Sequence, residues 1–394
     1  MMMDSLTQII SQNRATNCLD CGKCSAVCPI TRWGVHGYAS PRLLVEKATQ
    51  GGWQAVLDDE LFWSCLTCKR CTELCPSRVS FSELVRDLRS LGRAEGRSGT
   101  CTHSGAVHTW CKIMTQPDLH QNRLGWLTSD LIVSDHSDTL YFTGCLPYYD
   151  TLFGHIGFEG VKIAQAAIKI MNHLGIHPQV LADERCCGHD QLWQGDLETF
   201  RALALLNLEQ FANIGVKRII TTCPECARTL KVDYPQLVGS HSMEVLHIAE
   251  LLSESDLSLL QGATRGRSLT GVKGTPSEPL VTYQDPCRLG RHLGVYDAPR
   301  KVLGDLGFTV AEMAHNRHAS LCCGTSCWTS CGSASKNIQV ERLSEAKATG
   351  ADLLVTACLK CQIHFKCAQH DPNLGEKINI EMQDLTTFVA ERLA

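Results

Sequence analysis

The sequence predicts an α/β protein in which a helical N-terminal domain precedes two homologous α/β modules with parallel sheets. Three observations lead to this prediction. Two matched cysteine quartets lie within the first 95 of the 394 residues. The rest of the chain repeats itself with an offset of roughly 135 to 142 residues. Each repeat alternates short β-rich runs with amphipathic helices, as parallel sheets with helical crossovers require.

Cysteine is the unusual feature of the composition, with 23 residues. A chain of this length can bury its own cores without disulfides, so metal binding is the better explanation. The N-terminal stretch carries Asp4 and lacks the apolar segment of a secretory signal, and no apolar run reaches membrane-spanning length. We therefore expect a cytoplasmic protein, with at most peripheral association at the inner face of the cytoplasmic membrane. The net charge of −4 and the lack of a basic stripe exclude a nucleic-acid partner.

Both quartets follow the spacing C-x2-C-x2-C-x3-C-P, and their members are Cys18, Cys21, Cys24 and Cys28, then Cys65, Cys68, Cys71 and Cys75. In this motif three thiolates bind one cubane cluster and the fourth binds the other cluster. One cluster is therefore predicted on Cys18, Cys21, Cys24 and Cys75, and the other on Cys65, Cys68, Cys71 and Cys28. Zinc is the weaker alternative, because a zinc site does not need this register twice.

Helices are expected around the quartets. Ser40 and Pro41 begin one between them, and the segment SFSELVRDLRSLG forms another after Cys75. Residues 1–95 thereby resemble the helical ferredoxin domains of heterodisulfide reductases and of succinate dehydrogenase iron–sulfur subunits. The resemblance implies two [4Fe-4S] clusters that transfer electrons within a larger complex. Residues 96–137 are predicted to be a connector, in which Trp110 and Trp126 anchor a partner or, more simply, pack.

The first module is predicted over residues 138–256 and the second over 279–394. In the first, helices are expected over 158–175 and 198–215, and in the second over 298–307 and 335–350. The intervening residues 257–278 are rich in Gly, Ser and Thr and are predicted to be a flexible linker.

Cysteines follow the predicted strands of each module. Because the carboxyl ends of parallel strands line a ligand crevice, five cysteines should converge in each module. The two sets are Cys145, Cys186, Cys187, Cys223 and Cys226, then Cys287, Cys322, Cys323, Cys358 and Cys361. A lone buried cysteine is usually packing, but adjacent cysteines repeated at matching offsets favour metal.

This pattern, C-x40-CCG-x34-C-x2-C followed by C-x34-CCG-x33-C-x2-C, resembles the twin CCG domains of heterodisulfide reductase catalytic subunits. With the ferredoxin part in front, the whole chain resembles the D-type subunit of that enzyme. The resemblance implies that each five-cysteine set binds a noncubane [4Fe-4S] cluster and that a disulfide is cleaved between the two clusters. The expected function is an iron–sulfur oxidoreductase subunit that passes electrons through the ferredoxin-type clusters to twin clusters, which reduce or form a disulfide or related small-molecule acceptor.

A second function stays open. Iron–sulfur subunits of glycolate, lactate and anaerobic glycerol-3-phosphate dehydrogenases share the architecture. The alternative is thus a non-catalytic electron-transfer subunit that links a flavoprotein dehydrogenase or electron-transfer flavoprotein to a membrane quinone or cytochrome partner. The chain has neither G-x-G-x-x-G after a strand nor G-x4-G-K-[ST], so electrons should arrive from a flavoprotein, hydrogenase-like or membrane cytochrome b-like subunit.

Residues beside the predicted ligands are candidates for assisting roles. His189 follows Cys187 and Gly188 and is a candidate proton donor, or a structural residue that bonds a backbone carbonyl. Arg288 and His292 follow Cys287 and are candidates to hold an anionic substrate tail, whereas Arg291 is expected to be a solvated charge.

The segment LCCGTSCWTSCG, residues 321–332, holds two cysteines beyond the predicted ligands. Gly324 is expected to allow a close approach of the backbone to the metal. A helix starting here would place Cys323, Cys327 and Cys331 on one face. Cys327 would then be a thiol in the substrate cleft or a packed core residue. The roles of Cys101, Cys111, Cys331 and Cys367 stay open.

Overall fold

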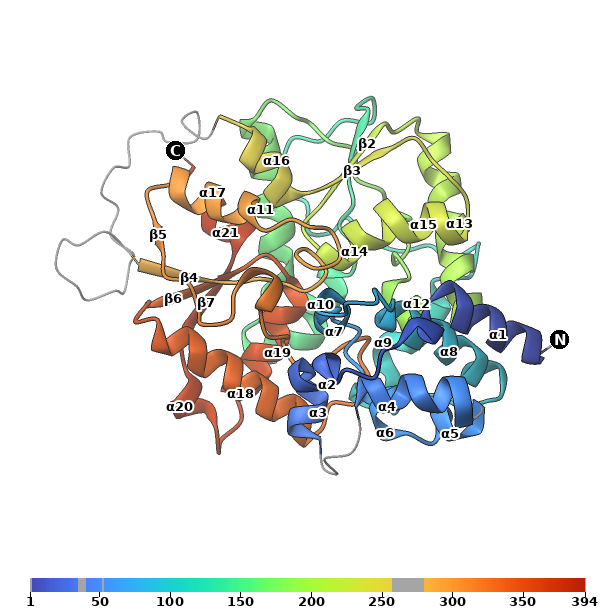
Figure 1. Cartoon of the computed structure of the whole chain (residues 1–394). Coiled ribbons are helices and arrows are strands. Elements are labelled where there is room, and N and C mark those ends of the chain that lie inside the picture. Colours follow the sequence, from blue (N-terminus) through green and yellow to red (C-terminus); the bar gives the residue numbers. More distant parts are fainter. Residues whose placement is uncertain (1, 35–39, 52, 257–279, 394) are drawn as a thin grey trace. The chain divides into compact units, whose positions relative to one another are not determined.

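The computed structural model describes residues 2–34, 40–51, 53–256 and 280–393 (Figure 1). The predicted linker, residues 257–278, lies outside these ranges. The chain forms two compact units. The helical unit comprises Met1–Thr115, Gly188–Leu203 and Leu321–Glu341, and the α/β unit comprises Gln116–Cys187, Ala204–Ser320 and Arg342–Ala394. The domain boundaries expected from the sequence stay predictions.

Short helices make up the helical unit. They are α1 (Met2–Gln12), α2 (Lys23–Val27), α3 (Pro29–Trp33), α4 (Pro41–Glu46), α5 (Trp53–Leu57), α6 (Glu60–Ser64), α7 (Arg70–Glu73), α8 (Phe81–Ala94), α9 (Ala106–Ile113) and α12 (His189–Trp193). The expected cap is present, since the Ser40 hydroxyl accepts from the Leu43 N–H of α4. Helix α8 buries Leu84, Val85 and Leu88 on one face, as its sequence periodicity predicts.

The α/β unit holds two sheets, and every strand pair in them is parallel, as predicted. The first has the order β1 (Thr139–Tyr141), β2 (Arg218–Thr221), β3 (Glu244–His247), and the second the order β5 (Thr309–Val310), β4 (Leu280–Gln284), β6 (Leu353–Thr356), β7 (Glu381–Asp384). Their helices are α10 (Leu146–Phe153), α11 (Gly160–His173), α14 (Pro224–Arg228), α15 (Tyr234–Leu237), α16 (Ile248–Glu254), α17 (Asp297–Asp305), α19 (Leu359–Gln369), α20 (Gly375–Ile378) and α21 (Leu385–Ala390). Two helices, α13 (Leu197–Asn213) and α18 (Ser333–Ala348), begin in the helical unit and end in the α/β unit.

Strands at equivalent positions of the two modules pair in the same register. Thr139 pairs with Arg218 in the first sheet, and the equivalent Val281 pairs with Leu353 in the second. Because a slip of one residue would turn every buried side chain outward, equal registers mean that both modules bury equivalent positions. The two modules are therefore structural as well as sequence homologues.

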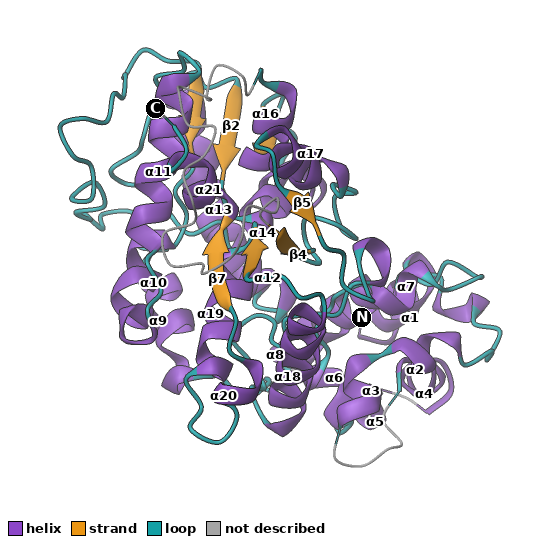
Figure 2. Ribbon diagram, turned by 90° about the vertical axis from the view of Figure 1, so that its left-hand side faces the viewer, coloured by secondary structure: helices purple, strands orange, loops and turns teal. Residues whose placement is uncertain are grey.

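The modules pack together through two equivalent contacts. Helix α16 of the first module packs on α17 of the second, and α21 of the second packs on α11 of the first. Figure 2 shows these helices flanking the strands. Helices α16 and α21 occupy the same position in their modules, as do α11 and α17. The contact is thus an internal counterpart of a two-fold symmetric dimer interface.

His247 and Asp384 end the last strand of each module and cap the helix that follows. His247 Nδ1 accepts from the Ala249 N–H at 3.1 Å, and Asp384 Oδ1 accepts from the Thr386 N–H at 2.8 Å. Burial lowers the pKa of His247 to about 4 and raises the pKa of Asp384 to about 6. Among the described residues, Asp384 Oδ2 is buried without a hydrogen-bond partner. Equivalent positions therefore carry caps with opposite responses to pH.

We expect the Asp384→Asn variant to lose less stability than the wild-type protein as the pH rises. The pKa of Asp384 in the folded protein is about 6, above the ordinary value of 3.8. The stability that the protonated Asp384 contributes is therefore fully present below pH 3.8 and is lost as the pH rises through about 6. Asparagine caps a helix about as well but does not ionise. The variant should gain up to about 3 kcal/mol over wild type between pH 4 and 7, measured as the difference in Tm across pH. Asn in place of the exposed Asp305 is the control, and a difference that does not vary with pH would contradict the prediction.

Candidate metal centres

The two quartet loops of the helical unit share one backbone conformation. Residues two and four positions after the first cysteine of each loop have left-handed φ: Asp20 at 53° and Gly22 at 72°, then Thr67 at 47° and Lys69 at 64°. A β-branched residue such as Thr67 rarely adopts this conformation. Strain of this kind persists where the surrounding structure over-determines the backbone, which is typical of ligand-binding loops.

Charge interactions among the quartet cysteines show which of their thiols lie near one another. Burial raises the pKa of the Cys24 thiol, and the nearby Cys18 and Cys75 raise it further. Burial also raises the pKa of Cys71 far above its usual value, with Cys28 and Cys68 adding to the effect. Helices α2 and α7, which carry the two loops, pack against each other. Cys18 and Cys75 belong to the set predicted with Cys24, and Cys28 and Cys68 to the set predicted with Cys71, but Cys24 also lies near Cys71. The division of these cysteines between two clusters stays a prediction.

Backbone N–H groups point at the sulfurs. The Thr67 N–H lies 3.4 Å from Cys65 Sγ, and the Val79 N–H lies 3.4 Å from Cys75 Sγ. Burial raises the pKa of Cys65 to about 12, so a thiolate there needs a compensating positive charge. Iron would supply that charge, and N–H donors to the sulfurs are a common means of tuning an iron–sulfur cluster. The donor set fits cubane clusters.

All five predicted ligands of the first module lie in the α/β unit, where four of them form two close pairs. Cys145 Sγ lies 3.6 Å from Cys186 Sγ, and Cys226 Sγ lies 3.4 Å from Cys187 Sγ. Cys223 is next to Cys226, since the two thiols interact directly. Hydrogen bonding among these thiols, followed by burial, raises the pKa of Cys187 and Cys226 well above the ordinary value. The structure therefore brings the first set of cysteines together. A bound metal cation would stabilise their thiolate forms, which the neighbouring thiols and burial disfavour.

The closeness of the loops explains the glycine before Cys145. Gly144 has φ of 64°, and a Cβ added there would lie 3.1 Å from Cys226 Sγ. Any side chain at this position would therefore be strained and would crowd a predicted ligand.

A buried carboxylate that sequence reasoning missed organises the loop before Cys145. Glu184 accepts the N–H groups of Thr143 at 3.0 Å and Gly144 at 2.8 Å, and it pairs with Arg123 at 2.8 Å. Burial raises the pKa of Glu184 to about 7, and Arg123 opposes the shift. Because Glu184 lies two residues before Cys186, it joins the loops that carry two predicted ligands.

Two further buried side chains hold the backbone of the cysteine pair. Asn207 Nδ2 donates to the carbonyl of Cys186 at 3.2 Å, and the Tyr234 hydroxyl donates to the carbonyl of Cys187 at 3.1 Å. Asn207 and Tyr234 also bond each other at 3.1 Å. Neither belongs to a motif, and only the fold identifies them.

The second set of ligands is divided between the units. Cys287 follows β4, and Cys358 and Cys361 stand at the start of α19 in the α/β unit, whereas Cys322 and Cys323 belong to the helical unit. Their convergence on one cluster stays a prediction.

The segment LCCGTSCWTSCG does not form the helix that would have aligned its cysteines. Residues 321–332 form turns, and α18 begins at Ser333. Cys327 and Trp328 both have φ of 54°, which ends any right-handed helix, and Thr329 bridges to Cys101. Cys327 is fully buried and Cys331 is exposed, so they do not share a face. The burial of Cys327 matches the packing alternative for this residue.

The glycine that completes this CCG motif has a structural reason of its own. Gly324 has φ of 87°, and a Cβ there would lie 2.6 Å from the Ser335 carbonyl oxygen. Gly188, its equivalent in the first module, has φ of 79°, and a Cβ there would lie 2.8 Å from the Phe200 ring. The CCG glycines are therefore required by the turn and by packing within the helical unit.

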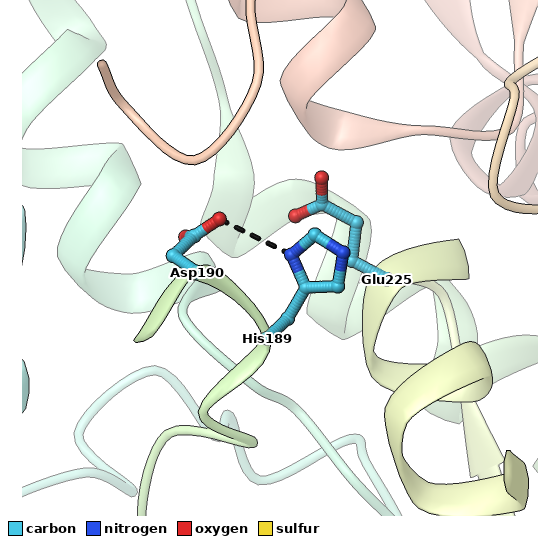
Figure 3. A group of neighbouring side chains, drawn as sticks. All are labelled: His189, Asp190 and Glu225. Atoms are coloured by element: carbon cyan, nitrogen blue, oxygen red, sulfur yellow. Dashed lines mark hydrogen bonds and ion pairs between the residues drawn. The ribbon is translucent and has the colours of Figure 1, made fainter. Parts of the chain in front are cut away.

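His189 is buried at the start of α12, and its Nδ1 lies 3.2 Å from the carboxylate of Asp190 (Figure 3). This partner was not expected from the sequence. The Asp190 carboxylate is a hydrogen-bond partner that orients the imidazole ring of His189. Proton delivery by His189 stays a proposal.

The turn after Cys287 differs from expectation at one residue. Arg291 is not a solvated charge: it is buried and donates to the carbonyls of His318 at 3.1 Å and Ser320 at 2.8 Å. Arg288 and His292 contact each other through their side chains. Their role toward an anionic substrate stays a prediction.

Within the helical unit, the second quartet loop contacts the segments that follow both CCG motifs. Arg89 is 1% exposed and donates to the carbonyls of Cys65 at 3.0 Å and Trp193 at 3.0 Å. The Thr67 hydroxyl lies 3.4 Å from the Ser326 hydroxyl. Trp193 lies six residues after Cys187, and Ser326 three after Cys323. The segments that leave both cysteine pairs therefore reach the same ferredoxin-type loop.

Two family models match the chain. A cysteine-rich domain model, CCG, matches residues 139–231 and again 281–366, and a 4Fe-4S dicluster domain model matches residues 14–79. Known proteins match along most of the chain. The D-type subunit of the dihydromethanophenazine:CoB–CoM heterodisulfide reductase of Methanosarcina mazei is 29% identical over 96% of this chain and 93% of its own length.

Two other relatives carry different names. The EtfAB:quinone oxidoreductase of Syntrophomonas wolfei is 26% identical over 88% of this chain, which spans 54% of that protein. The B-type subunit of the fumarate reductase (CoM/CoB) of Methanothermobacter marburgensis is 25% identical over 91% of this chain and 69% of its own length. In the part of this chain that the structure describes, no helix is both long and apolar enough to cross a membrane.

Proposed function

Because the chain belongs to the CCG-domain iron–sulfur oxidoreductases related to the D-type subunit of heterodisulfide reductase, we propose that a disulfide or a related small-molecule acceptor is reduced or formed on it. The observation that carries this proposal is the convergence of the first five-cysteine set, with its two sulfur pairs at 3.4 and 3.6 Å. The second CCG match at residues 281–366 supports an equivalent site in the second module.

Two cubane clusters and two noncubane [4Fe-4S] clusters are the proposed cofactors. Cleaving a disulfide consumes two electrons and two protons and yields two thiols, whereas a cubane delivers one electron at a time. When bound, the twin clusters would supply the two electrons together. Within the helical unit, Arg89 and the Thr67–Ser326 contact hold the second quartet loop against the segments that follow both CCG motifs, and we propose that the cubane of this loop donates electrons to both twin clusters.

The proposed partners are redox subunits that deliver electrons to the ferredoxin-type clusters: a flavoprotein, a hydrogenase-like protein or a membrane cytochrome b-like protein. We place the complex in the cytoplasm or at the inner face of the cytoplasmic membrane. For the protons, His189 with Asp190 at its Nδ1 is the proposed donor to a nascent thiolate.

A second candidate function is favoured by the similarity to the EtfAB:quinone oxidoreductase. In that case the chain passes electrons between an electron-transfer flavoprotein and a membrane quinone or cytochrome, without a substrate of its own.

Electron paramagnetic resonance (EPR) of the purified full chain separates the two functions. After oxidation, addition of a thiol should change the signal of the CCG clusters if a thiol or disulfide binds there, while the cubane signals stay the same. A chain that only transfers electrons should show no thiol-dependent signal, but should be reduced by electron-transfer flavoprotein. The absence of a thiol response would overturn the disulfide proposal.

A further inference from the structure

The two C-x2-C motifs of the modules differ in one charged residue. The first reads Cys223-Pro-Glu225-Cys226 and the second Cys358-Leu-Lys360-Cys361. Glu225 and Lys360 therefore occupy the same position in the repeat, in the first turn of α14 and of α19. Figure 3 shows the side chain of Glu225.

These equivalent residues meet in the α/β unit. Lys360 Nζ lies 2.6 Å from a carboxylate oxygen of Glu225, and the two side chains are 5% and 12% exposed. By comparison, the pair of Lys231 with Glu250 in the same unit is longer, at 3.5 Å, and more exposed. The Glu225–Lys360 pair is thus a short and largely desolvated link between the two modules.

The internal two-fold relation explains why these two residues face each other. In a two-fold interface, a residue close to the axis contacts its own counterpart. If both modules kept the same charged residue here, two like charges would be buried together, at a large cost in free energy. Glu in one module and Lys in the other turn this self-contact into an attractive pair.

The pair does more than join two surfaces, because each partner lies between two predicted cluster ligands. Replacing a buried ion pair with apolar residues often leaves stability unchanged or higher, so stability alone is a weak reason for such a pair. A hydrogen-bonded ion pair does constrain geometry, since it needs a set distance and direction. Any shift of one C-x2-C loop against the other would break it.

We propose that Glu225 and Lys360 are positioning residues that hold the two C-x2-C loops face to face and so set the distance and orientation between the two CCG clusters. This inference rests on the proposed function, because it assumes that both clusters bind. The role is distinct from ligation: neither side chain replaces a cysteine. The positioning role predicts that the spacing of the two clusters depends on the presence of the ion pair and not on which module carries the positive charge.

Four variants of the full chain test the proposal. Lys360→Met and Glu225→Gln each remove one charge, whereas the exchange Glu225→Lys with Lys360→Glu rebuilds the pair in the opposite direction. Lys231→Met, which breaks the more exposed pair of the same unit, is the matched control. The measurements are iron content, the magnetic coupling between the two CCG clusters by EPR, and the Tm of the iron-loaded protein.

We expect both single variants to lower the Tm by roughly 5 °C or more, because each removes the opposite charge from a largely buried ionic side chain. They should keep most of their iron but change the coupling between the clusters. The exchanged pair should restore both the coupling and the Tm, while the control should match wild type. Normal coupling in both single variants, or an exchanged pair no better than either, would overturn the positioning role. A wild-type protein with cubane signals alone would instead overturn the proposed function and this inference with it.

Discussion

Cys187→Ala is expected to lose about a quarter of the bound iron, roughly four of 16 atoms per chain. Cys187 pairs with Cys226 at 3.4 Å, and its carbonyl is held by Tyr234, so its sulfur cannot be replaced by a neighbouring group without moving the backbone. The loss should be confined to the first-module cluster. The cubane signals should persist, because the quartets belong to the helical unit and contain none of these residues.

Iron analysis together with EPR measures the effect, and Cys327→Ala provides the control. Cys327 is another fully buried cysteine, and it follows a CCG motif, but it is outside the predicted ligands. Iron content should stay at the wild-type value in this control. Equal iron loss in both variants would mean that burial rather than ligation explains the effect. Full iron in Cys187→Ala would remove this residue from the ligand set.

Arg89→Met is expected to destabilise the helical unit by at least about 3 kcal/mol. Arg89 donates to the carbonyls of Phe62, Trp63, Cys65 and Trp193 at 2.8 to 3.2 Å. Methionine fills a similar volume but leaves these acceptors without their donor, and a buried unsatisfied polar group costs about 1 to 3 kcal/mol. Because one acceptor is the carbonyl of Cys65, the signal of the cubane bound by the second quartet should also change.

Thermal unfolding and EPR of the reduced protein measure these effects, and Arg93→Met is the control on the same helix. Arg93 makes a partly exposed pair with Asp196 at 3.2 Å, so its loss should cost at most about 1 kcal/mol. An Arg89 variant as stable as the Arg93 variant would show that solvent replaces the lost donor. An unchanged cubane signal would remove the proposed link between Arg89 and the cluster loop.

Sequence reasoning succeeded where the signal is local or repeated. The Ser40 cap, the helices α8 and α11, and the placement of cysteines after parallel strands all follow from short-range patterns. It could not decide residues 321–332, where cysteines four positions apart imitate one face of a helix. Pairing of Thr329 with Cys101, and of the Trp328 carbonyl with Thr102, fixes left-handed turns instead. Tertiary contacts override local periodicity in this segment.

The sequence by itself determined which atoms are available for chemistry, because the spacing of cysteines around tight turns is a local property of the chain. It also determined the two-module architecture, since a duplication leaves its trace in every strand and helix. Only the tertiary structure decided which distant side chains serve those cysteines: Glu184 and Arg89 on the loops, and Glu225 opposite Lys360. Such contacts join residues from 24 to 135 positions apart, and they form where buried charges and carbonyls must find partners once water is excluded.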